Sequence, residues 1–170
     1  MTENDRKFIS YIITRWEGGY SNHPDDSGGE TCYGITKKYF PNEFETIMKI
    51  DKKLDYAIRF YYKNFMSKLN GLPKCLKYFL TDFYINAGNN AIRVFQMSIK
   101  QLGQFLDING VFGEQTKSAA NKINKNILLK QLYKNRKEYY WLLNKPVFIK
   151  GWINRTQDIY EKVKHGKWHS

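Results

Sequence analysis

Apolar side chains recur every three or four residues along most of this chain, and no other feature restricts its fold as strongly. This spacing places them on one face of a helix, which must then be buried against a neighbour. Clear stripes begin at Phe8, Leu54, Leu76 and Ile92. The sequence therefore predicts a mainly α fold, and its 170 residues suffice for one core or for two small lobes that share one.

Capping residues, glycines and prolines mark where these helices start and stop. Thr2 and Asp5 fit a capping box at the start of the first helix, and Gly18 ends it. Pro146 and Gly151 are expected to separate the last two helical segments. Further helices are expected over residues 51–70, 73–87, 91–102, 119–142 and 153–163, with a turn-rich element at 107–116.

The segment from Tyr20 to Thr36 breaks the helical pattern. It is rich in glycine and aspartate and contains Pro24. These residues favour tight turns, and the short runs between them allow extended backbone. We therefore expect a lysozyme-like, mainly α chain with a small β-hairpin after the first helix.

Glu17 stands at the carboxyl end of the first helix, directly before this segment. The negative end of a helix dipole and an apolar neighbour such as Trp16 both favour the uncharged form of a carboxyl group. The acid of a glycosidase must hold a proton near neutral pH, because it protonates the leaving oxygen. Glu17 is therefore the candidate general acid, and a solvated helix-end residue is the alternative.

Further polar and aromatic side chains lie on the glycine-rich segment itself. Asp26 and the hydroxyl of Thr31 are candidates for a supporting role, in which they position water or stabilise a positively charged transition state. Tyr20 and Tyr33 are candidates to line a sugar-binding cleft. For Asp26 the alternative is a turn residue that bonds its own backbone.

The string EGGYSNHPDDSGGETCYGIT, which starts at Glu17, resembles glycoside hydrolase family 108, the muramidases of phage and of secretion systems. The spacing of Glu17, Asp26 and Thr31 is also similar to that in phage-type lysozymes. The resemblance implies hydrolysis of the β-1,4 bond between N-acetylmuramic acid and N-acetylglucosamine in peptidoglycan. In that reaction Glu17 is the acid, Asp26 and Thr31 support it, and neither a cofactor nor a metal takes part. His23 stands where the family has an aspartate.

The remainder of the chain is similar to the peptidoglycan-binding module that follows such domains. In DFYINAG, which ends at Gly88, the resemblance implies that Asn86 faces the substrate cleft. Gln96, the stretch NGVFGEQT and the stretch GWINR resemble the module, although Asn109 replaces its usual aspartate. We therefore expect a catalytic domain over residues 1–90 and a helical peptidoglycan-binding domain over 91–170, packed on the first.

Charge allows several partners. The net charge of +12 predicts attraction to an anionic polymer, which includes nucleic acid, a membrane surface and the cell wall. The basic residues are scattered and match no RNA-binding motif, so specific nucleic-acid binding is not expected. Peptidoglycan is the expected partner of a monomeric enzyme. Two rivals stay open: a lytic transglycosylase and a non-catalytic peptidoglycan-binding protein.

Several routes by which the protein could reach the cell wall are compatible with the sequence. Residues 1–16 lack the basic start and the uninterrupted apolar stretch of a signal peptide, and no run of the sequence is apolar enough to span a bilayer. We therefore expect synthesis in the cytoplasm and release to the wall through a holin or by lysis. A phage endolysin and a secretion-associated muramidase both fit this expectation.

The cysteines and two of the tryptophans are expected to be structural. Cys32 and Cys75 fit no metal-binding spacing, and two free thiols are favoured over a disulfide. Trp141 and Trp152 occur at helical spacing and are expected in the core or between the lobes.

Overall fold

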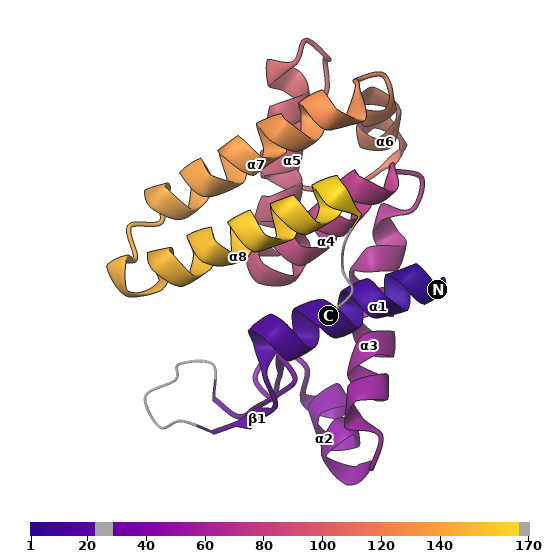
Figure 1. Ribbon diagram of the computed structural model, residues 1–170, viewed down its shortest axis with the longest axis vertical. Coiled ribbons are helices and arrows are strands. Elements are labelled where there is room, and N and C mark those ends of the chain that lie inside the picture. The colour runs from indigo at the N-terminus through magenta and orange to yellow at the C-terminus, as the bar shows by residue number, and fades with distance from the viewer. Residues whose placement is uncertain (23–28, 167–170) are drawn as a thin grey trace. The chain divides into compact units, whose positions relative to one another are not determined.

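The computed structural model describes residues 1–22 and 29–166. Its helices and strands belong to two compact units. The first unit comprises Met1–Asn64, and the second begins at Phe65 and includes the remaining helices. Figure 1 shows the helices and strands of both units.

The first unit is built on helix α1 (Glu3–Ile12). Thr2 caps it: its side chain accepts a hydrogen bond from the Asp5 backbone, and the Asp5 side chain accepts one from the Thr2 backbone. This reciprocal pair confirms the predicted capping box. Phe8 and its apolar neighbours are fully buried, and α1 packs against α3 (Lys53–Asn64).

A single π-helical turn, η1 (Ile13–Glu17), continues α1. Gly18 ends it with φ 71°, and its N–H donates to the Ile13 carbonyl oxygen at 3.1 Å. The helix therefore ends at Gly18, as predicted. The widened turn is not visible in the sequence, and such turns occur often at functional sites.

Three short strands form the predicted β element. They are β1 (Tyr20–Ser21), β2 (Thr31–Cys32) and β3 (Ile35–Thr36), paired antiparallel in that order. Cys32 pairs with Ile35, so a two-residue turn joins β2 to β3. Its residues Tyr33 and Gly34 have φ of 49° and 76°. Positive φ at both positions is the requirement of the tight hairpin turn that matches strand twist.

Helix α2 (Pro41–Lys49) completes the first unit and is absent from the sequence-based prediction. Pro41 lies in its first turn, where a missing backbone N–H costs nothing. Only Phe44 and Ile47 are buried, and they pack the helix against β2, β3 and α3. A stripe of two residues is too short to be recognised by its period.

In its described residues, the second unit contains only helices and the loops that join them. It starts with the 3₁₀ turn η2 (Met66–Leu69), and α4 (Lys74–Ala87) contacts three of the helices that follow. Those helices are α5 (Asn89–Gln101), α6 (Glu114–Asn121), α7 (Lys125–Leu142) and α8 (Pro146–His165). Figure 1 shows α7 and α8 side by side, as their packing contacts also indicate.

Two predicted boundaries were wrong. The helix expected to run to residue 70 ends at Asn64, and η2 follows it. The last helix begins at Pro146 instead of near residue 153, because proline occupies its first turn. Gly151 lies inside that helix instead of interrupting it, since one glycine costs only about 1 kcal/mol in a packed helix.

A buried ion cluster joins three helices of the second unit. Asp82 of α4 accepts from Arg136 of α7 at 2.6 Å and from Nε of Arg155 of α8 at 2.9 Å. Asp82 and Arg136 are fully buried. The Arg136 guanidinium also lies over the Phe79, Phe83 and Tyr140 rings, at 4.9–5.6 Å from their centroids.

The turn-rich element at 107–116 is held to α5 through the buried Gln96. Its Nε2 donates to Asn109 Oδ1 at 2.9 Å and to Thr116 Oγ1 at 3.0 Å. Its Oε1 accepts from the Gly110 backbone N–H at 2.9 Å. The polar residues of this motif therefore form one hydrogen-bonded clamp, and Asn109 satisfies it in place of an aspartate.

Candidate active site

Glu17 is the last residue of η1, where the chain turns from the first helix into the sheet. Its side chain is half-buried and lies against the β2–β3 turn. A Cβ added to Gly34 would come within 2.8 Å of Glu17 Oε2 and 3.1 Å of Glu17 Cβ. The carboxyl group is thus fixed between a helix end and a strand turn, not extended into solvent.

Tyr61 of α3 fixes the other side of that turn. It is buried, and its hydroxyl donates to the Tyr33 carbonyl oxygen at 3.0 Å. The same added Cβ at Gly34 would overlap the Tyr61 hydroxyl. The Glu17 carboxyl and the Tyr61 hydroxyl therefore crowd one point above Gly34, where only glycine fits.

The first helix and the sheet are joined here by backbone contacts. The Tyr33 N–H donates to the Gly19 carbonyl oxygen at 3.1 Å, directly after the end of η1. Sequence reasoning missed the roles of Gly34 and Tyr61. Gly34 has a local signal, since glycine follows an aromatic residue between two short β runs, whereas Tyr61 has none because it belongs to an ordinary apolar stripe.

Tyr20 belongs to a polar cluster on the exposed part of the sheet. Its hydroxyl donates to Glu30 Oε1 at 3.0 Å, and Lys37 Nζ lies 2.6 Å from Glu30 Oε2. The bonds from Lys37 and Tyr20 lower the pKa of Glu30, and the bond to Glu30 raises the pKa of Tyr20. Glu30 therefore stays ionised with its charge matched by Lys37.

Of the two residues predicted to support Glu17, Thr31 is among the described residues and Asp26 is not. Thr31 lies on β2, and its hydroxyl donates to the Gly29 carbonyl oxygen at 3.3 Å. Asp26, like His23, lies outside the described residues. The roles of both Asp26 and Thr31 stay predictions.

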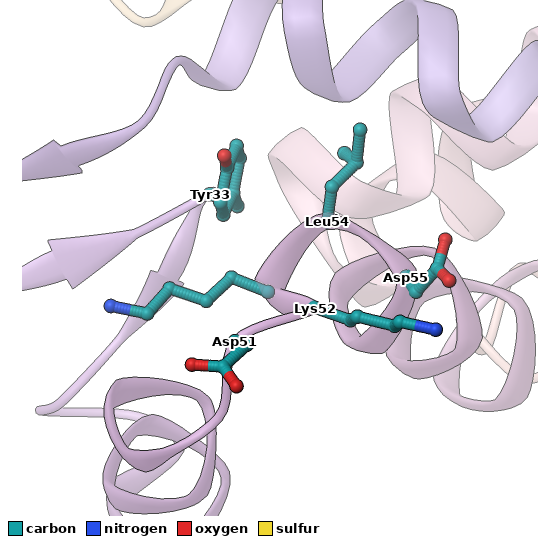
Figure 2. Close-up of a pocket in the computed structure, with 6 residues that line it drawn as sticks. Tyr33, Asp51, Lys52, Leu54 and Asp55 are labelled. Carbon is teal, nitrogen blue, oxygen red and sulfur yellow. The ribbon is translucent and has the colours of Figure 1, made fainter.

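Tyr33 lines an open surface pocket of about 430 Å³. Figure 2 shows its ring on the hairpin side of this pocket and Leu54, from the start of α3, on the other. Asp51, Lys52, Lys53 and Asp55 complete the lining, and Asp55 is ion-paired with Arg6. The lining of the pocket thus combines charges of both signs with one aromatic ring.

Asn86 and the cysteines have local roles within their own units. Asn86 is exposed on α4, and its Nδ2 donates to the Asp82 backbone oxygen at 2.9 Å. Its predicted contact with substrate stays a prediction. Cys32 in the first unit and Cys75 in the second are free thiols, and burial raises the pKa of both.

Within residues 1–22 and 29–166, no group of three or more His, Cys, Asp and Glu side chains converges in a way that would hold a metal ion. In the same part of the chain, no helix has both the length and the apolarity to cross a bilayer.

Two protein families and several solved structures resemble this chain. Residues 10–88 match the family described as glycosyl hydrolase 108, and residues 90–157 match one described as a predicted peptidoglycan domain. Ten solved chains are similar. One is Brucella abortus SagA, with 26% sequence identity and a TM-score of 0.75 over 95% of this chain and 94% of that one. Among curated proteins none matches.

Proposed function

We propose that this chain is an N-acetylmuramidase. It belongs to the glycosyl hydrolase 108 family through residues 10–88 and to a peptidoglycan domain family through residues 90–157. The matches establish a glycoside hydrolase that acts on peptidoglycan. The proposal adds the bond: the β-1,4 link from N-acetylmuramic acid to N-acetylglucosamine. We also propose residues 1–90 as the catalytic part and 91–170 as the wall-binding part, since the family matches change between residues 88 and 90.

The placement of Glu17 carries the proposal. Its carboxyl group is half-buried at a helix end and packed against Gly34, within a match to a glycosidase family. A general acid must be held at a fixed position, because proton transfer needs it within hydrogen-bond distance of the leaving oxygen. We therefore assign to Glu17 the donation of a proton to the glycosidic oxygen.

The second half of the reaction needs a group that stabilises positive charge at the sugar or activates water. We assign this to Asp26, with Thr31 in support. Glu30 is less suited, because Lys37 and Tyr20 already bind both of its oxygens. Tyr20, Tyr33 and Asn86 are proposed to contact the glycan.

The biological setting follows from these assignments. A monomer that binds peptidoglycan through its second part and cuts it through its first suits a phage endolysin released by a holin, or a muramidase tied to a secretion system. The net charge of +12 adds attraction to acidic wall polymers.

Mass spectrometry of fragments released from purified sacculi tests the bond and the chemistry together. A muramidase releases fragments with reducing N-acetylmuramic acid ends, each heavier by one water than the anhydro ends of a transglycosylase. The variant Glu17→Gln keeps the shape of the side chain but has no acidic proton. We expect it to lose at least about 10²-fold in rate with an unchanged circular dichroism spectrum.

Each rival predicts a different outcome. Anhydro-sugar ends would replace hydrolysis by transglycosylation. Binding of wild-type protein to sacculi without any release of fragments would support a non-catalytic binding protein. Full activity of Glu17→Gln would remove Glu17 from the mechanism.

A further inference from the structure

The connection from α7 to α8 carries an exposed apolar surface, in contrast to the burial expected for Trp141. Five of its side chains are exposed, and we call them the apolar tip: Trp141 (62% exposed), Leu142 (84%), Leu143 (38%), Val147 (87%) and Phe148 (57%). Single exposed apolar residues are common, but a contiguous group of large ones marks an interaction surface. The prediction of a core position was wrong for Trp141, because the stripe of α7 turns outward at its end.

The apolar tip is anchored to the second unit by stacked rings. Phe148 stacks on Trp152 with centroids 5.6 Å apart, and Trp152 stacks on Tyr140 at 5.0 Å. Tyr140 is buried, so this column reaches the helical core. The tip is therefore presented by packed helices, as Figure 1 shows for α7 and α8.

Charge around the apolar tip is mainly positive. The sequence contains no Asp or Glu between Glu138 and Asp158, whereas Lys145 and Lys150 both occur there and are exposed. Lys134 and Lys137 line a groove together with Trp141 and Glu138, and Glu138 lies 3.9 Å from the Lys134 ammonium group. Long lysine side chains can place their apolar stems beside such a tip and their ammonium groups at its rim.

We propose that the apolar tip inserts into the interface of an anionic phospholipid bilayer. Exposed aliphatic and aromatic side chains enter the boundary of the acyl chains, tryptophan prefers that boundary, and the lysines bind lipid phosphates. A glycan is a poorer fit, because Leu142 and Val147 offer neither hydrogen bonds nor a ring for a sugar to stack on. A second copy of the chain is a poorer fit, because the rim lysines would repel each other.

Co-sedimentation of the full chain with vesicles tests the proposal without reference to catalysis. We expect binding to vesicles of phosphatidylglycerol and phosphatidylcholine, much weaker binding to phosphatidylcholine alone, and a decrease as salt rises. Leu142→Asp and Val147→Asp should each reduce binding at least about tenfold. The matched control is Phe105→Asp, which changes an even more exposed residue of the same unit outside the tip.

Tryptophan fluorescence provides an independent readout. Anionic vesicles should shift the emission to shorter wavelength, and Trp141→Phe should remove most of that shift. Equal binding to neutral vesicles, or equal loss with Phe105→Asp, would overturn the proposal. Loss of sacculus binding in Leu142→Asp with no effect on vesicles would assign the tip to the wall. A dimer that Leu142→Asp dissociates would assign it to a second copy.

Discussion

The carboxyl group of Glu17 lies against Gly34, so that a methyl group on Gly34 would come within 2.8 Å of Oε2. Glu17 ends the first helix and Gly34 occupies the β2–β3 turn, seventeen positions further along the chain. The two elements therefore position the Glu17 carboxyl group together.

Gly34→Ala should reduce both activity and stability. Positive φ costs a non-glycine residue about 1–2 kcal/mol, and overlap with Tyr61 and Glu17 should add about 1–3 kcal/mol. Gly103→Ala is the matched control, because Gly103 also has positive φ (88°) but open space around its Cβ position. Urea unfolding and peptidoglycan turnover measure the two effects. Equal behaviour of both variants would show that crowding at Glu17 is unimportant.

Tyr61→Phe should lower the turnover rate while it reduces the free energy of unfolding only slightly. It removes only the hydroxyl that donates to the Tyr33 carbonyl oxygen, a bond worth about 0.5–1.5 kcal/mol. Because that hydroxyl also crowds the position beside the Glu17 carboxyl, we expect a decrease in kcat with little change in KM. Tyr56→Phe, on the same helix, is the control and should leave kcat unchanged. A normal kcat for Tyr61→Phe would limit Tyr61 to a structural role.

Asp26→Asn and Glu30→Gln separate the contributions of these two acidic residues of the glycine-rich segment. Asp26→Asn should lower the rate at least about 10²-fold if Asp26 supports the transition state. Glu30→Gln should lower it less than about tenfold, because the charge of Glu30 is already matched by Lys37. Initial rates on sacculi distinguish the two. The reverse ranking would transfer the supporting role to Glu30.

Asp82→Asn should destabilise the second unit in a pH-dependent way. Burial alone would raise the pKa of Asp82, but Arg155 and Arg136 outweigh it and hold the pKa below its usual value. A carboxyl group whose pKa is lowered in the folded state stabilises that state. This stabilisation is complete at pH values above the pKa of the unfolded chain, about 3.9, and is lost as the pH falls through the lower pKa of the folded state.

The loss in Asp82→Asn should therefore be about 3–5 kcal/mol at pH 7 and shrink below about pH 4. Urea unfolding at pH 7, 5 and 3.5 measures this dependence. Asp107→Asn, at an exposed position of the same unit, is the control. A constant difference between wild type and Asp82→Asn across this range would contradict the account.

Local patterns of the sequence predicted much of the fold. The Thr2–Asp5 capping box and the Gly18 end of the first helix depend on residues within one turn of each other, so they are visible without tertiary structure. The β element after Gly18 was predicted for the same reason. The sequence pattern does not predict helix α2, because only Phe44 and Ile47 give it an apolar face.

The sequence by itself determined the mainly α architecture, the position of Glu17 at a helix end and the family resemblance, because each depends on neighbouring residues. Only the tertiary structure decided that Gly34 and Tyr61 enclose Glu17, that Asp82 holds two arginines, and that Trp141 is exposed. Those relationships join residues far apart in the chain. They arise from the contact of α3 with the β2–β3 turn and from the packing of α7 with α8, which no local spacing encodes.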